Sequence, residues 1–168
     1  MDPVDTDYKA EFSSFLEEVG LSARAIDLDD EHDRLSVFDR VLRRRIGANE
    51  PLDDVAMLIA REPDRTMAES VIGRFLRPGV DASVKTSLGA AAGDSRFVRT
   101  RILELEALEM LSAADASWID GDVPRTGWFE EALSETSSSR DVLAHLAEHA
   151  ARRRARSTAS RRLRELSP

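Results

Sequence analysis

Hydrophobic residues recur every three or four positions along most of the chain, which is the period of an amphipathic α-helix. In residues 6–19, five large apolar side chains share one helical face: Tyr8, Phe12, Phe15, Leu16 and Val19. The same period predicts helices over residues 30–46, 51–62, 64–76, 82–92, 95–113, 127–135, 141–149 and 150–166. No run alternates with period two for long enough to predict a strand, so we expect an all-α protein.

Glycine, proline and aspartate predict where several of these helices begin and end. Gly47 should end the second helix, and Pro51 should be the first residue of the third. Asp94 can cap the helix over residues 95–113. On that helix we expect Phe97 to face the core and Glu104 to face solvent.

One helical outline occurs twice, with an offset of 87 positions. Eight pairs match when residues 54–76 are laid on 141–163: Asp54 with Asp141, Val55 with Val142, Ile59 with Leu146, Ala60 with Ala147, Ala68 with Ala155, Ser70 with Ser157, Arg74 with Arg161 and Leu76 with Leu163. Each copy has two helices that meet at a short corner. The small side chains Ala68 and Ala155 lie where the helices should approach closely.

These two stretches resemble a HEAT-type helical hairpin. The resemblance implies stacked antiparallel helical hairpins, a short α-solenoid with a binding surface and no chemistry of its own. We expect a single domain over residues 1–168. Its parts are an N-terminal helical cap (1–47), the first hairpins (51–113), a long loop (115–126) and a C-terminal hairpin with a basic last helix (127–168). The cap and the loop depart from a regular array, so an irregular helical bundle is the alternative.

Composition narrows the class of protein. Of the 168 residues, 42% are hydrophobic and 33% charged, which is too apolar for a disordered chain. No apolar run reaches the roughly 20 residues of a membrane span, no apolar region follows Met1, and cysteine is absent. These features predict a cytoplasmic protein without disulfides. Lysine occurs only at positions 9 and 85, and the preference for arginine suggests a high-GC bacterial genome.

The charge is acidic overall but basic at one end. Residues 150–168 contain seven arginines and one glutamate, a local +6, so the net charge of −8 leaves −14 for the remainder. We expect the basic last helix to dock either on an acidic partner protein or on the acidic body of the same chain. Its candidate partner-binding residues are Arg152, Arg153, Arg154 and Arg156.

The segment from Trp118 to Trp128 is a second candidate surface. Two tryptophans flank Asp-Gly-Asp and Pro in the longest irregular connection of the chain. Tryptophan commonly anchors such a segment to a core, and it also dominates binding hot spots. The predicted hot-spot residues are Trp118, Arg125 and Trp128.

His145, Glu148 and His149 spell H-x-x-E-H, the pattern of inverted zincins, with both imidazoles on one helical face. Such enzymes resemble one another in taking a third zinc ligand from a downstream glutamate. Here only Glu165 follows, and three consecutive arginines oppose a dication. We therefore predict no metal, no cofactor and no catalytic residue, and keep a zinc-dependent hydrolase using His145 and His149 as a remote alternative.

The function predicted from sequence is a non-enzymatic protein-interaction or scaffold module. The alternative is nucleic-acid binding through the arginine-rich last helix, although no aromatic side chains are interleaved with the arginines for base stacking. No membrane contact and no small-molecule substrate are predicted.

Overall fold

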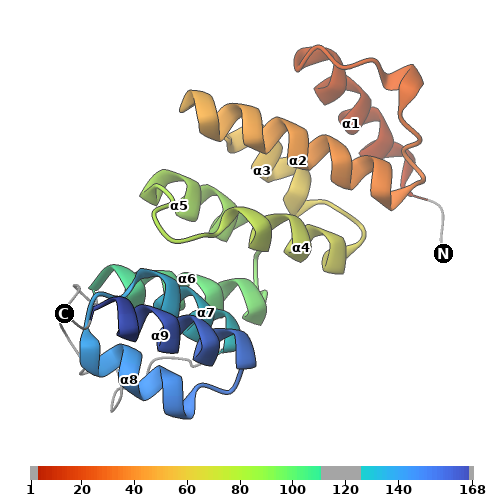
Figure 1. The fold of residues 1–168 in the computed structure, drawn as a ribbon. Coiled ribbons are helices and arrows are strands. Elements are labelled where there is room, and N and C mark those ends of the chain that lie inside the picture. Colours follow the sequence, from red (N-terminus) through yellow and green to blue (C-terminus); the bar gives the residue numbers. More distant parts are fainter. Residues whose placement is uncertain (1–3, 111–125, 167–168) are drawn as a thin grey trace. The chain divides into compact units, whose positions relative to one another are not determined.

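The computed structural model describes residues 4–110 and 126–166, and these residues form helices and connecting turns without a strand (Figure 1). The elements are α1 (Thr6–Glu18), the 3₁₀ turn η1 (Ala23–Ala25), α2 (Glu31–Ala48), α3 (Asp53–Ala60), α4 (Arg65–Phe75), α5 (Ala82–Ala91), α6 (Arg96–Met110), α7 (Gly127–Thr136), α8 (Arg140–His149) and α9 (Arg153–Glu165). The prediction of an all-α class is confirmed. None of these helices is long and apolar enough to cross a membrane.

Two helix ends differ from the sequence prediction. Gly47 does not end the second helix, because α2 continues to Ala48 and ends where Asn49 adopts a left-handed φ of 55°. Asparagine tolerates this conformation better than most residues do. Pro51 lies before α3 and is not its first residue, since Leu52 occupies the N-cap. Gly20, by contrast, has the positive φ of 73° expected of a helix stop.

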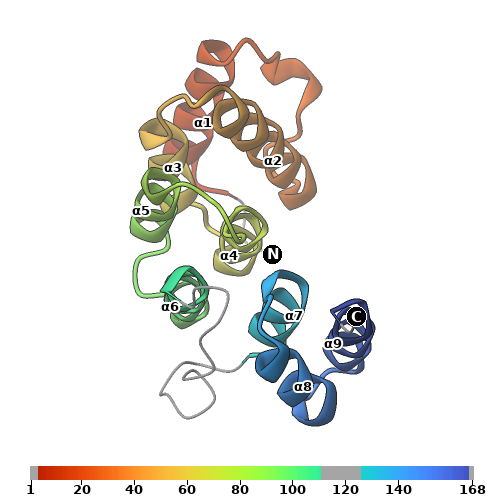
Figure 2. The same cartoon turned by 60° about the vertical axis from the view of Figure 1, so that its left-hand side comes forward.

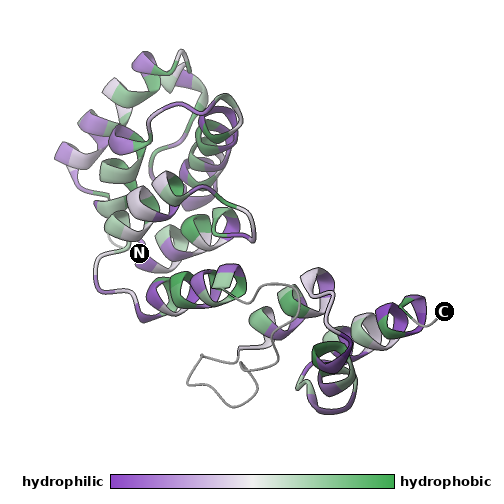
Figure 3. Ribbon diagram, turned by 90° about the vertical axis from the view of Figure 1, so that its left-hand side faces the viewer, coloured by the Kyte–Doolittle hydropathy of each residue, from purple (hydrophilic) through white to green (hydrophobic). Residues whose placement is uncertain are grey.

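The contacts divide the chain into two compact units, Met1–Arg99 and Thr100–Pro168. In the first unit, helices pack mainly on helices two positions away in chain order. α3 packs between α1 and α5, and α2 packs on α4 (Figure 2). The aromatic centre is Phe12, whose ring centroid lies 5.3 Å from that of Phe38. Figure 3 shows hydrophobic and hydrophilic residues alternating along the ribbon of these helices, as expected of amphipathic helices.

The second unit is built around α9, which packs along α8 and also on α7. Its buried core consists of Phe129, Leu133, Val142, Leu143, Leu146, Ala150, Ala155 and Ala159. Ala155 and Ala159 are fully buried, so the centre of the α9 contact consists of two small side chains. Leu163 is partly buried against the same core.

Helix α6 contains two errors of the sequence prediction. Phe97 was expected to face the core, yet 45% of it is exposed. Glu104 was expected to face solvent, yet it is 1% exposed, because it accepts hydrogen bonds from the hydroxyl (2.5 Å) and the backbone N–H (3.2 Å) of Thr126. Asp94 is fully exposed, and the hydroxyl of Ser95 instead accepts from the N–H of Val98 at 3.2 Å.

Candidate interaction surfaces

The arginines of the last helix separate into two groups. Four of them have partners within the second unit: Arg152 with Glu131 (3.2 Å), Arg154 with Glu135 (3.3 Å), Arg156 with the carbonyls of Ala150 (2.6 Å) and Ala151 (3.0 Å), and Arg162 with the carbonyl of Ser134 (3.0 Å). These arginines therefore join α9 to α7 and close the corner between α8 and α9. Three of the four arginines predicted to bind a partner, Arg152, Arg154 and Arg156, belong to this group.

The remaining three, Arg153, Arg161 and Arg164, are exposed. They are eight and three positions apart, so at 100° per residue they fall within about 80° of the α9 circumference. Within the described chain none of them bonds to a carboxylate or a carbonyl. We call them the α9 basic stripe. Of the predicted candidates, only Arg153 lies in it, and the sequence analysis did not single out Arg161 and Arg164 from their neighbours.

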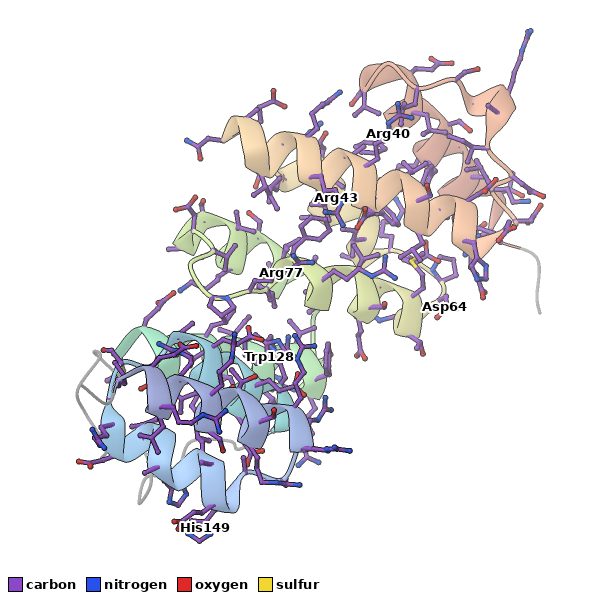
Figure 4. All side chains as sticks on the ribbon, viewed as in Figure 1. Arg40, Arg43, Asp64, Arg77, Trp128 and His149 are labelled. Carbon is purple, nitrogen blue, oxygen red and sulfur yellow. The ribbon has the colours of Figure 1, made fainter. Side chains whose placement is uncertain are left out.

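Trp128 is held against its own unit. The guanidinium of Arg101 stacks 3.5 Å from the centroid of its ring, and Arg101 Nε lies 3.4 Å from Glu104 Oε2. Burial lowers the pKa of Arg101 despite the nearby charge of Glu104. The half-buried indole thus anchors the start of α7 (Figure 4). The other two predicted hot-spot residues, Trp118 and Arg125, lie outside the described residues.

The two histidines of the H-x-x-E-H pattern do lie together on α8. Their ring centroids are 4.8 Å apart, with His145 half-buried and His149 exposed. Glu148 Oε2 lies 3.5 Å from His149 Nε2. Among the described residues, no three His, Asp or Glu side chains are grouped so that they could hold a metal ion.

A second group of exposed arginines lies in the first unit, on α2 and α4. Arg43 lies between these helices, 2.7 Å from Asp39 and 5.8 Å from the ring centroid of Phe75 (Figure 4). Arg74 reaches the same Asp39 at 3.9 Å. One carboxylate therefore neutralises only part of the positive charge on this side of the unit.

A buried polar network in the first unit has no counterpart in the sequence analysis. Glu62 accepts from Tyr8 Oη (2.6 Å), from Arg34 Nη2 (2.9 Å) and Nε (3.1 Å), and from the N–H of Asp64 (3.1 Å). Arg34 also donates to the carbonyl of Leu28 at 2.8 Å. The side chains of Arg34 and Glu62 are 2% and 0% exposed. No signal within one sequence could pair them, because the partners of Glu62 lie 28 and 54 positions away.

This network raises the pKa of Tyr8 and of Arg34, although burial acts on the two groups in opposite directions. Burial, the hydrogen bond to Glu62 and the charge of Glu62 all raise the pKa of Tyr8 above its ordinary value of 10.0. For Arg34, burial lowers the pKa, but the hydrogen bonds and charge of Glu62 outweigh it and raise the pKa. Both groups therefore keep their protons at neutral pH, and every polar partner of the buried carboxylate is a donor. The arrangement is structural and leaves no open position for a substrate.

Comparison of the chain with family models, curated proteins and solved structures finds no match.

Proposed function

We propose that this chain is a non-enzymatic protein-interaction module that binds an acidic protein surface through the α9 basic stripe. The observation that carries the proposal is that the arginines of the last helix fall into two structural groups. Arg153, Arg161 and Arg164 are exposed on one side of a helix, whereas Arg152, Arg154, Arg156 and Arg162 are used to hold that helix in place.

The rigidity of α9 supports this role. The helix is fixed by Ala155 and Ala159, both fully buried, and by arginine contacts to α7 and to the α8–α9 corner. A charged surface on a preorganised helix loses less conformational entropy on binding than the same charges on a free tail. Complementary charge also accelerates encounter with an acidic partner. A HEAT-like hairpin array that presents such a surface in the cytoplasm is consistent with this proposal.

Nucleic acid is the second candidate ligand. The favouring observation is the second arginine group, in which Arg43 and Arg74 are exposed around Asp39 on α2 and α4. Phosphate binding through both groups would make affinity fall steeply with salt. The net charge of −8 opposes it, because a long polyanion would meet mostly acidic surface.

The test is affinity capture from nuclease-treated native lysate. The stripe variant carries Arg153→Glu and Arg161→Glu. A matched control carries Arg24→Glu and Arg96→Glu, two exposed arginines elsewhere with the same change in charge. We expect wild type and control to retain a protein partner, and the stripe variant to bind it at least about tenfold more weakly, because two attractions become repulsions.

Two results would reject this proposal. Retention of the partner by the stripe variant would show that α9 is not the contact. Recovery of nucleic acid alone, lost after nuclease or at moderate salt, would establish the second candidate instead.

A further inference from the structure

Three pockets adjoin one another along α3 in the first unit. Their volumes are 320, 240 and 220 Å³. The first and second share Asp53 and Ser87, and the second and third share Met57. The pockets therefore form one furrowed surface, which extends from the α2–α3 connection across α3 to α1 and α5.

The lining of this surface is acidic and apolar. Six carboxylates line the three pockets: Glu11, Glu18, Glu50, Asp53, Asp54 and Asp81. None of the lining residues of these pockets is Lys or Arg. Met57 stands at the centre with 61% of its surface exposed. We call this surface the acidic face.

Four of the six carboxylates remain available for an external cation. Glu11 pairs with Arg61 and Asp54 with Arg45. Glu18, Glu50, Asp53 and Asp81 form no ion pair within the described chain, and only Glu18 and Glu50 of these act electrostatically on Arg45. A ligand for this face should therefore carry several cations and an apolar element to cover Met57.

The α9 basic stripe has this composition. It presents three exposed arginines on one side of α9. Arginine side chains also have apolar stems that can cover a hydrophobic ridge while the guanidinium reaches a carboxylate. Because it offers both charge and apolar surface, the stripe is complementary to the acidic face.

We propose that the acidic face of one copy of this chain binds the α9 basic stripe of a second copy. The inference rests on the proposed function and names its acidic partner. The two surfaces differ, so the contact is heterologous, and a pair of copies joined by one contact still offers one free acidic face and one free stripe. Association therefore continues head to tail with rising concentration and does not stop at a symmetric dimer.

The experiment measures mass by sedimentation equilibrium at low salt, from about 5 to 500 μM, the range of weak specific association. The acidic-face variant carries Glu18→Arg and Glu50→Arg, two exposed residues. It is compared with the stripe variant defined above. We expect the average mass of wild type to rise with concentration beyond that of two chains, and each variant alone to remain monomeric.

Mixing the two variants gives the decisive result. The acidic-face variant still has an intact stripe, and the stripe variant still has an intact acidic face. A one-to-one mixture should therefore associate, although neither variant associates alone. In a chain with all four substitutions, the acidic face becomes basic and the stripe becomes acidic, while the net charge stays at the wild-type value of −8. This chain should again associate beyond two copies.

The control variant carries Glu69→Arg on α4 and Glu106→Arg on α6. Its net charge changes by the same amount as that of the acidic-face variant. It should associate within about twofold of wild type, because it leaves both surfaces intact. Far-UV circular dichroism should match for all variants. If it does not for the acidic-face variant, Glu18→Gln with Glu50→Gln replaces it and should weaken association in the same direction.

Three results would overturn the inference: wild type monomeric throughout, no pairing in the mixture, or loss of association in the control. The proposed function can fail separately. If wild type is monomeric but the stripe variant loses a captured partner, only the second-copy inference fails. If the stripe variant keeps its captured partner, the proposed function fails as well.

Discussion

The helix pairs α3–α4 and α8–α9, related by 87 positions, share part of their buried apolar pattern. Four matched pairs are buried to between 0% and 2% exposure in both: Val55 with Val142, Ile59 with Leu146, Ala68 with Ala155 and Ile72 with Ala159. This agreement is confined to four buried positions of the overlay. It shows that the spacing of small and branched side chains sets which face of each helix turns inward.

The polar corners of the two hairpins differ completely. Glu62 is a buried carboxylate held by Arg34 and Tyr8, whereas His149, its match in the overlay, has 62% of its side chain exposed. The helices also pack differently. α8 lies along α9, while α3 packs on α5, α2 and α1 and α4 packs on α2. One apolar pattern is therefore compatible with two modes of packing, and the polar contacts distinguish them.

The largest difference should appear when the matched corner residues are replaced. Glu62→Ala leaves the buried guanidinium of Arg34 without its carboxylate, which should cost about 3–5 kcal/mol of unfolding free energy. His149→Ala removes an exposed side chain and should cost no more than about 0.5 kcal/mol. Urea denaturation followed by circular dichroism measures both. Equal losses would mean that the corners are equivalent after all.

A smaller difference is expected at the close approaches. Ala68→Leu and Ala155→Leu each overpack a buried position, at a cost of about 1–3 kcal/mol. The cost at Ala155 should be the greater, because α9 packs on both α7 and α8. Calorimetric unfolding of the two variants gives the comparison, with Ala10→Leu on the exposed side of α1 as control. A larger loss at Ala68 would reverse the ranking.

The smallest effect concerns the matched aspartates and depends on pH. Burial opposes ionisation of Asp54, but the hydrogen bonds and charge of Arg45, 2.6 Å away at one oxygen, bring its pKa below the ordinary 3.8. A lowered folded-state pKa stabilises the protein above pH 3.8, and this contribution is lost as pH falls further. Because Asp54 is partly exposed, Asp54→Asn should cost at most about 1 kcal/mol at pH 7.

The matching Asp141→Asn should change stability by no more than about 0.5 kcal/mol, the helix-dipole contribution of an exposed first-turn aspartate. Urea denaturation at pH 7 and near pH 2.5 tests both substitutions. At the lower pH the Asp54 effect should become smaller, since the carboxyl is then protonated in the unfolded chain and loses its charge in the folded chain as pH falls through the lowered pKa. A cost that persists in acid would assign the effect to packing and not to charge.

The sequence analysis predicted the helices and buried faces that depend on local periodicity. It missed the side-chain contacts that depend on partners far away in the sequence. Helix positions and the buried faces of α1, α4 and α9 follow from spacing alone, and so does the burial of Ala155. Glu104 was misplaced because its hydrogen-bond donor, Thr126, lies 22 positions away. Gly47 was misplaced because Asn49, two residues later, adopts the left-handed conformation that ends the helix.

The candidate surfaces show the same limit. Sequence located the basic helix, but it could not tell an arginine that holds α9 to α7 from one that faces solvent. That distinction needs the positions of Glu131 and Glu135 relative to α9. The acidic face was missed because its carboxylates come from α1, α3 and the connections before α3 and α5.

The buried Arg34–Glu62 pair has a consequence for protein engineering. A hairpin that satisfies its own polar groups can be transplanted as a cassette, with its supporting helix, into another scaffold. The segment α7–α9 meets this condition at its corner, where the partners of Arg152 and Arg156 lie within the segment. The segment α3–α4 does not, since a graft lacking α1 and α2 would carry an orphaned carboxylate into the host.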